Sequence, residues 1–321
     1  MTDPKNFEAP DLQAIRTAAE RIRPYAHRTP VLTCSSLNKM TGSELFFKCE
    51  NLQKVGAFKF RGAANTVFSL SENEVAGGVA THSSGNHAQA LALAARLRGI
   101  PAHIVMPENS PKVKVAAVRD YGARIVFCPP TQRDREQTLE KVVAETGATF
   151  IHPYDNLRII AGQGTCALEL LDQVPGLQIV MAPVGGGGLL SGTALSCAHL
   201  DPKIRVFAAE PKGADDAFRS IRDGRIYPSE NPQTIADGLR TSLGTRTFPI
   251  IRRYVERIVT VEEQSIVAAM RHIWERMKIL VEPSAAVPFA AVLEGDFQTR
   301  GRRIGIILSG GNVDLDTLPW L

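Results

Sequence analysis

Short apolar runs alternate with segments of helical character along most of this 321-residue chain. This alternation predicts an α/β fold built from open, doubly wound sheets. Four of the runs lie close together, at 79–81, 102–105, 124–128 and 149–152. We therefore expect a small domain over residues 62–154, inserted into a large domain formed by residues 1–61 and 155–321. A ligand is expected in the cleft between the two domains, where the chain crosses twice.

The composition argues against several classes of protein. The chain is 44% hydrophobic and 22% charged, which allows a sizeable core, and its net charge of +4 is spread along the sequence. Dispersed charge argues against nucleic-acid binding, and no apolar run is long enough to span a membrane. Five cysteines without C-x-x-C spacing argue against a disulfide framework or zinc. With no signal-peptide pattern before a helix expected near Asp11, we expect a cytoplasmic metabolic enzyme.

A run of four glycines, Gly185–Gly188, lies between a strand and a helix. The apolar residues 179–184 predict a buried parallel strand, and a helix is expected over Leu189–Leu200. Glycines let the backbone approach a ligand closely, and the N–H groups at the start of a helix favour a phosphate. A nicotinamide-binding G-x-G-x-x-G does not fit, because Leu190 and Ser191 stand where its last glycine would fall. The run favours phosphate binding, with an ordinary tight turn as the alternative.

Lys59 lies between two aromatic residues, Phe58 and Phe60. Such surroundings make a lysine a candidate for desolvation, which lowers its pKa and yields a neutral amine for Schiff-base chemistry. The alternative is a surface lysine whose stem packs on apolar atoms while its charge stays in water. The glycine run and the segment described next favour the first interpretation.

The segment 83–87, Ser-Ser-Gly-Asn-His, follows a strand expected at 78–82 and precedes a helix expected at 88–98. Serine and asparagine are common N-cap residues, so ordinary capping accounts for part of the pattern. The N–H groups at the helix start also suit a carboxylate. In addition, the Asn86 amide can donate a hydrogen bond to an oxygen on the ring of a bound cofactor, and the Ser84 hydroxyl can exchange a proton. Capping and ligand binding are compatible here.

Lys59, the segment 83–87, the glycine run and Ser309-Gly310-Gly311-Asn312 occur in this order, and together they predict a pocket for pyridoxal 5'-phosphate (PLP). These segments resemble those of fold-type II PLP enzymes, specifically the serine racemase and serine/threonine dehydratase family. The resemblance covers nearly the whole chain, from residue 29 to residue 313. It implies two α/β domains with the cofactor in the cleft between them, and a homodimer.

By this resemblance, Lys59 forms the Schiff base with PLP and Ser309 meets the pyridine nitrogen. A serine hydroxyl can hydrogen-bond that nitrogen but cannot protonate it, so the cofactor is a weaker electron sink and loss of a β-substituent competes well. The residues that the resemblance assigns to the substrate are Ser83, Ser84, Asn86, His87 and Arg135. Those that it assigns to the cofactor are Phe58, Lys59, Asn86, Gly185, Gly186, Gly187, Gly188, Leu189, Gly238, Glu282 and Ser309.

Glu210, Ala214 and Asp216 match a divalent-cation site of the same family, with Ala214 contributing its backbone carbonyl. Two carboxylates, a carbonyl oxygen and water suit Mg²⁺, Ca²⁺ or Mn²⁺. From the residues alone, the alternative is a solvated acidic turn after a strand expected at 205–209. We expect a cation, with Mg²⁺ as the first candidate, that stiffens the large domain and takes no part in the reaction.

The resemblance implies a dehydratase that converts L-serine, L-threonine or 3-hydroxyaspartate to a 2-oxo acid and ammonia by α,β-elimination. Arg135 would pair with a second substrate carboxylate and favour 3-hydroxyaspartate. The alternative is a serine racemase in which Lys59 and Ser84 act as opposing bases. Ala57 and Tyr154 depart from the racemase pattern, which disfavours racemisation. A non-enzymatic PLP-binding or amino-acid-sensing protein is a third hypothesis, disfavoured because the lysine and the proton donor are both present.

Overall fold

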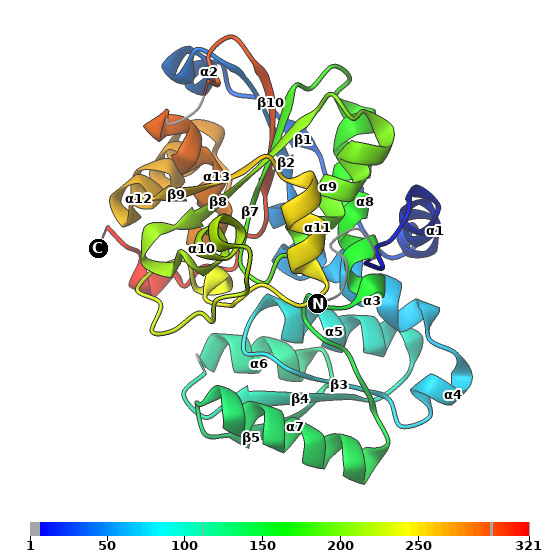
Figure 1. The fold of residues 1–321 in the computed structure, drawn as a ribbon. Helices are drawn as coiled ribbons and strands as arrows, with labels where there is room; N and C mark the ends of the chain where they lie inside the picture. Colours follow the sequence, from blue (N-terminus) through cyan, green and yellow to red (C-terminus); the bar gives the residue numbers. More distant parts are fainter. Residues whose placement is uncertain (1–6, 111, 296–297, 321) are drawn as a thin grey trace.

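Two sheets organise the computed structural model, which describes residues 7–110, 112–295 and 298–320 (Figure 1). The larger sheet has the strand order β1-β2-β10-β7-β8-β9. β1 runs antiparallel to β2, and all other neighbouring strands are parallel. The strands of this sheet are β1 (Val31–Leu32), β2 (Glu44–Cys49), β7 (Ile179–Pro183), β8 (Arg205–Pro211), β9 (Arg257–Val261) and β10 (Arg303–Leu308).

The smaller sheet is entirely parallel, with the strand order β5-β4-β3-β6. Its strands are β3 (Val79–His82), β4 (Ala102–Pro107), β5 (Arg124–Cys128) and β6 (Thr149–Phe150). All four apolar runs expected between residues 62 and 154 are strands, although β6 ends before residue 152. The division of the chain into a small domain over residues 62–154 and a large domain over the rest stays a prediction.

Helices cover both faces of each sheet, which confirms the α/β class. The helices are α1 (Leu12–Ile22), α2 (Ser35–Thr41), α3 (Lys59–Ser69), α4 (Glu72–Val75), α5 (Asn86–Arg98), α6 (Lys112–Asp120), α7 (Gln132–Thr146), α8 (Leu157–Gln173), α9 (Gly188–Leu200), α10 (Asp216–Asp223), α11 (Thr247–Tyr254), α12 (Glu263–His272) and α13 (Pro283–Glu294). On the larger sheet, α12 and α13 pack on one face, and α8 and α9 on the other. On the smaller sheet, α3 and α5 face α7 across the strands.

β7 and residues 304–308 of β10 are apolar throughout because both of their faces are buried. In β10, Ile306 is in register with Phe47 of β2 and Met181 of β7, and all three side chains belong to the core under α12 and α13. The next residue, Ile307, belongs instead to the core under α8 and α9. A continuous apolar run in the sequence therefore serves two cores at once.

The connections that follow β3, β7 and β10 carry the motifs singled out in the sequence. Ligands of parallel α/β sheets bind beyond the carboxyl ends of the strands, where such connections lie. The helix α3 packs against α5 of the smaller sheet and α8 of the larger, so it spans both halves of the molecule. The fold thereby places Lys59, the first residue of α3, where the two sheets meet.

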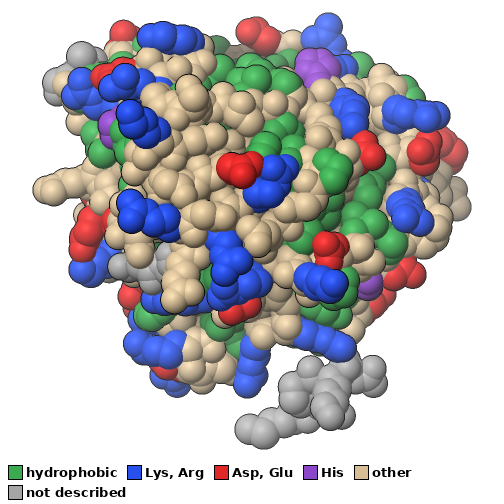
Figure 2. Space-filling view, turned by 90° about the horizontal axis from the view of Figure 1, so that it is seen from above, with side chains coloured by type: hydrophobic (Ala, Val, Ile, Leu, Met, Phe, Trp, Pro, Cys, Tyr) green, Lys and Arg blue, Asp and Glu red, His purple; other side chains and the backbone are tan. Residues whose placement is uncertain are grey.

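The surface carries charges of both signs. Figure 2 shows basic and acidic side chains interspersed over one face of the molecule, with apolar side chains between them. Within the described ranges, no helix combines the length and the apolar character that a membrane crossing requires.

Candidate active site

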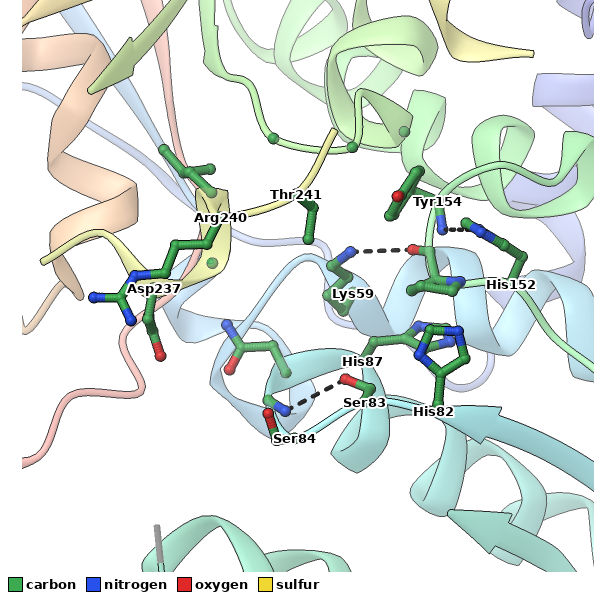
Figure 3. A pocket seen from close by; sticks show the side chains of 18 of the residues that line it. Lys59, His82, Ser83, Ser84, His87, His152, Tyr154, Asp237, Arg240 and Thr241 are labelled. Carbon is green, nitrogen blue, oxygen red and sulfur yellow. Dashed lines mark hydrogen bonds between the residues drawn. The ribbon is translucent and has the colours of Figure 1, made fainter. Parts of the chain in front are cut away.

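A cavity of about 990 Å³ opens among the connections that follow strands of both sheets (Figure 3). Every residue that the sequence assigned to the cofactor or to the substrate lines this cavity, from Phe58 and Lys59 to Ser309. Its size is sufficient for a small cofactor together with an amino acid. The structure therefore brings the predicted motifs together, while the role of each residue stays a prediction.

Lys59 lies on the cavity wall. The backbone N–H of Phe58 donates to the carbonyl of Ser309 at 3.0 Å, which ties the start of α3 to the end of β10. Lys59 Nζ donates to the carbonyl of Pro153 at 3.1 Å. Burial lowers the pKa of Lys59 to about 8, while the negative charge of Glu282 opposes this shift. A neutral amine is therefore much more accessible here than at an exposed lysine.

The glycine loop, residues 185–188, connects β7 to α9. Gly187 has a φ of +87°, a conformation that residues with a side chain rarely adopt. A Cβ atom on Gly186 would lie 2.3 Å from ring atoms of Tyr154, so this position has no room for a side chain. The bare backbone lines the cavity at the positive end of α9, and α9 begins at Gly188, one residue earlier than expected. This arrangement suits a phosphate group.

The segment 83–87 connects β3 to α5 and lines the cavity with Ser83 and Ser84. The helix begins at Asn86, two residues earlier than expected, so Asn86 and His87 belong to its first turn. His87 is 2% exposed, and neither ring nitrogen has a hydrogen-bond partner among the described residues. Burial, and then the charge of Lys59, lower the pKa of His87 well below its usual value. The ring is therefore neutral near pH 7.

Glu282 is a buried carboxyl group held by an amide. Its two oxygens accept hydrogen bonds from Asn86 Nδ2 at 2.9 and 3.1 Å, and Asn86 Oδ1 accepts one from Asn312 Nδ2 at 2.9 Å. Burial, and then the negative charge of Asp237, raise the pKa of Glu282 to about 7. Near neutral pH this group therefore exchanges a proton readily, at the wall of the cavity.

The remaining predicted cofactor residues complete the cavity wall. Ser309 follows β10 and is 3% exposed. Gly238 lies in a single 3-10 turn, and its N–H donates to Ser284 Oγ at 3.1 Å. Leu189 lies in the first turn of α9. Like the glycine loop, all three line the cavity.

Arg135 reaches the cavity from α7, a helix of the smaller sheet. Its Nε atom is enclosed and has no hydrogen-bond partner among the described residues. Arg133, two residues earlier, is exposed. The same helix thus carries one arginine at the cavity wall and one at the surface.

The sequence pattern did not point to several residues of the wall, namely His82, His152, Asp237, Arg240 and Thr241 (Figure 3). Burial lowers the pKa of His152 to about 4, and its Nδ1 accepts the N–H of Asp155 at 2.9 Å. A signal for the two histidines was present, since each lies at or just after the carboxyl end of a parallel strand. Asp237, Arg240 and Thr241 carry no motif, and only the tertiary structure brings them to the cavity.

The predicted cation residues lie apart from this cavity, at the end of β8 and the start of α10. Glu210 and Asp216 are 1% and 2% exposed, and Asp216 Oδ2 has no hydrogen-bond partner among the described residues. Burial raises the pKa of Asp216 to about 6, and burial together with the charge of Asp216 raises that of Glu210. In the described part of the chain, no three His, Cys, Asp or Glu residues form a metal cluster. The donor set is therefore limited to the two carboxylates and backbone oxygen.

Comparisons with known proteins identify the family. The family described as "Pyridoxal-phosphate dependent enzyme" matches residues 22–310. A beta-hydroxyaspartate dehydratase of Paracoccus denitrificans (strain Pd 1222) is 51% identical over 311 residues, which cover 97% of this chain and 99% of the relative. A serine racemase of Arabidopsis thaliana is 52% identical over 315 residues, covering 97% and 95%. The solved structure of maize serine racemase has a TM-score of 0.95 and 49% identity, covering 97% and 96%. The chain therefore belongs to the pyridoxal-phosphate dependent enzymes, and its architecture is that of fold type II.

Proposed function

We propose that this enzyme removes water from a β-hydroxy amino acid, with 3-hydroxyaspartate as the preferred substrate, and releases a 2-oxo acid and ammonia. The observation that carries this choice is Arg135, whose enclosed Nε lacks a partner at the cavity wall. Arginine suits paired contacts with a carboxylate, and 3-hydroxyaspartate has one carboxylate more than serine or threonine. The dehydratase of Paracoccus denitrificans, named for β-hydroxyaspartate, supports the choice.

The residues of the cavity fit PLP. The glycine loop leaves no room for a side chain at Gly186, so its backbone would hold the phosphate. Lys59 Nζ is the amine that would hold the aldehyde carbon, and the hydroxyl of Ser309 would bind the pyridine nitrogen. When bound, PLP supplies an electron-withdrawing ring that makes the Cα–H bond of the substrate acidic. Phe58 and Asn86 would contact that ring.

The chain's own residues then perform the proton transfers and orient the substrate. Lys59 Nζ, whose pKa of about 8 leaves part of it neutral, takes the proton from the substrate Cα. The backbone N–H groups at the start of α5 bind the α-carboxylate, and the neutral His87 ring donates a further hydrogen bond to it. Arg135 binds the second carboxylate. The β-hydroxyl takes up the proton that Lys59 Nζ removed and leaves as water, and the released enamine reacts with a second water to give a 2-oxo acid and ammonia.

A divalent cation at Glu210, Ala214 and Asp216 is a further part of the proposal, with Mg²⁺ as the first candidate and Ca²⁺ or Mn²⁺ as alternatives. The orphaned Asp216 Oδ2 and the two raised carboxyl pKa values support it, since a hard cation would offset the repulsion of two buried carboxylates. These residues do not line the cavity, so the cation would stabilise the fold.

A homodimer and a cytoplasmic location complete the proposal. Leu52 and Leu280 are 46% and 50% exposed, and a hydrogen bond from Asn51 Nδ2 to the carbonyl of Leu280 holds their segments together. Exposed apolar side chains on adjoining segments suit contact with a second copy. Sedimentation of the purified protein measures this, and a monomer at micromolar concentration contradicts it.

The substrate assignment is tested by assaying oxo-acid formation from L-serine, L-threonine and the isomers of 3-hydroxyaspartate side by side. The wild type should be most efficient with one isomer of 3-hydroxyaspartate. Arg135→Gln should lower kcat/KM for that isomer about tenfold or more and change the value for serine little. Arg133→Gln is the matched control, because it removes an exposed arginine from the same helix. Equal losses for both substrates in Arg135→Gln contradict the assignment.

Serine racemisation is the second candidate function. Ser84 lines the cavity, and the Arabidopsis thaliana relative is named serine racemase. In this reaction Ser84 Oγ would return a proton to Cα on the face opposite Lys59 Nζ. Chiral analysis of the products from L-serine separates the candidates: D-serine forming faster than pyruvate favours racemisation, and its absence rejects it. Ser84→Ala should abolish D-serine formation, whereas Lys59→Ala should abolish both reactions.

A further inference from the structure

Asp155 binds a distant loop at the place where the chain returns from the smaller sheet to the larger. Its Oδ2 accepts hydrogen bonds from the N–H and the hydroxyl of Thr245, both at 3.0 Å. Its Oδ1 accepts the N–H groups of Arg246 and Thr247 at 2.8 and 3.2 Å. These N–H groups lie at the start of α11, where the helix itself supplies no acceptors and a negative charge is favoured. One carboxylate therefore satisfies the beginning of the helix.

Thr247, the first residue of α11, connects this helix to the glycine loop. Its side chain is fully buried, and its hydroxyl donates to the carbonyl of Gly186 at 2.8 Å. A Cβ atom on Gly187 would lie 2.9 Å from the Cβ of Thr247, so the loop rests directly on this side chain. In a trans peptide the C=O of one residue and the N–H of the next point in opposite directions. Holding the Gly186 carbonyl toward Thr247 therefore turns the Gly187 N–H away from Thr247.

Tyr154, next to Asp155 in the chain, contacts the same loop. A Cβ atom on Gly186 would meet the ring of Tyr154 at 2.3 Å, and one on Gly188 would meet its Cβ at 3.0 Å. Two consecutive residues thus contact the glycine loop and the helix that supports it. Gly244 is part of the same packing, since a Cβ there would lie 2.2 Å from Asp155 Cγ.

We infer that Asp155 is a positioning residue for the glycine loop, acting through Thr247 on the orientation of the peptide between Gly186 and Gly187. This inference rests on the proposed binding of PLP phosphate by that loop. The charge of Asp155 holds the start of α11, Thr247 holds the Gly186 carbonyl, and the Gly187 N–H is left free for a phosphate oxygen. Asp155 itself does not line the cavity, so it acts on the ligand only through these contacts.

The test compares PLP with pyridoxal, which lacks the phosphate. Asp155→Asn keeps the size of the side chain but removes its charge and turns one acceptor into a donor facing Thr245. The dissociation constant of PLP, from absorbance titration, should rise roughly ten- to hundredfold, while that of pyridoxal should change little. Phosphorus NMR of the bound PLP should show a shifted or broadened line. Asp11→Asn is the control, because Asp11 accepts the Ala14 N–H at 2.7 Å at the start of α1, outside the cavity.

A second pair of variants keeps the inference testable if Asp155→Asn fails to fold. Thr247→Val removes the hydroxyl without changing the shape of the side chain, and Thr247→Ser keeps the hydroxyl. The valine variant should weaken PLP binding like Asp155→Asn, and the serine variant should bind PLP nearly as the wild type does. Parallel losses of PLP and pyridoxal affinity, or unchanged PLP affinity in both Asp155→Asn and Thr247→Val, overturn the inference. A wild type that binds no PLP refutes the proposed function instead.

Discussion

Replacing Glu282 by glutamine should make the stability of the PLP-free protein less dependent on pH. The pKa of Glu282 rises from 4.5 to about 7, first through burial and then through the charge of Asp237. A carboxyl group with a raised pKa in the folded state binds its proton more tightly there than in the unfolded chain. Its contribution to stability is therefore largest at low pH and is lost as the pH rises from about 4.5 to about 7.

The magnitude follows from the two pKa values of Glu282. Between about pH 5 and about pH 8, this one titration lowers the free energy of unfolding of the wild type by about 2.5 kcal/mol. Glu282→Gln has no such titration, so its stability relative to the wild type should rise by about this amount over the same range. The glutamine also turns an N–H donor toward Asn86, which adds a cost that does not depend on pH.

Urea unfolding of both proteins without PLP, followed by circular dichroism at several pH values, measures the difference. Glu169→Gln is the matched control. Burial raises the pKa of Glu169, but the hydrogen bond and charge of Arg61 and the charge of Lys48 outweigh burial and hold it below its usual value. Glu169 is therefore ionised in both states over this range, and the cost of its replacement should stay constant. If the Glu282→Gln and wild-type curves run parallel from about pH 5 to about pH 8, the assignment of a raised pKa is refuted.

Four further outcomes are expected. The rate at which PLP combines with the PLP-free enzyme should rise with pH around a midpoint near 8, because only neutral Lys59 is nucleophilic; stopped-flow absorbance measures it, and a midpoint near 10.5 contradicts it. Arg61→Met should lower the free energy of unfolding by about 3–5 kcal/mol, because it leaves the buried carboxylate of Glu50 without its cation; an unchanged urea midpoint contradicts this. Gly186→Ala should weaken PLP binding in an absorbance titration by forcing the Tyr154 ring aside. Chelation should lower the melting temperature of the wild type but not that of Asp216→Ala, and an equal response contradicts the cation site.

Local features of the sequence were sufficient to predict the α/β class, the parallel strands and the main motifs of the cavity. The apolar run that became β7, the four glycines after it and the aromatic neighbours of Lys59 each act within a few residues. These features can be interpreted from the sequence because they depend only on local backbone geometry and on the period with which side chains are buried. The helix starts were one or two residues off at Gly188 and Asn86, because N–H groups of a loop can join the first turn without a visible signal.

Contacts between residues far apart in the chain decided the rest. Glu282 has a raised pKa because burial and the charge of Asp237, from another part of the fold, outweigh the hydrogen bond from Asn86, which lowers it. Asp155 and Thr247 are 92 positions apart in the chain, and no local pattern in either segment predicts their hydrogen bond. The sequence by itself determined which elements form and which chemical groups follow each strand. Only the tertiary structure decided which of those groups lie together without water, and it is this exclusion of water that sets their pKa values and the strength of their hydrogen bonds.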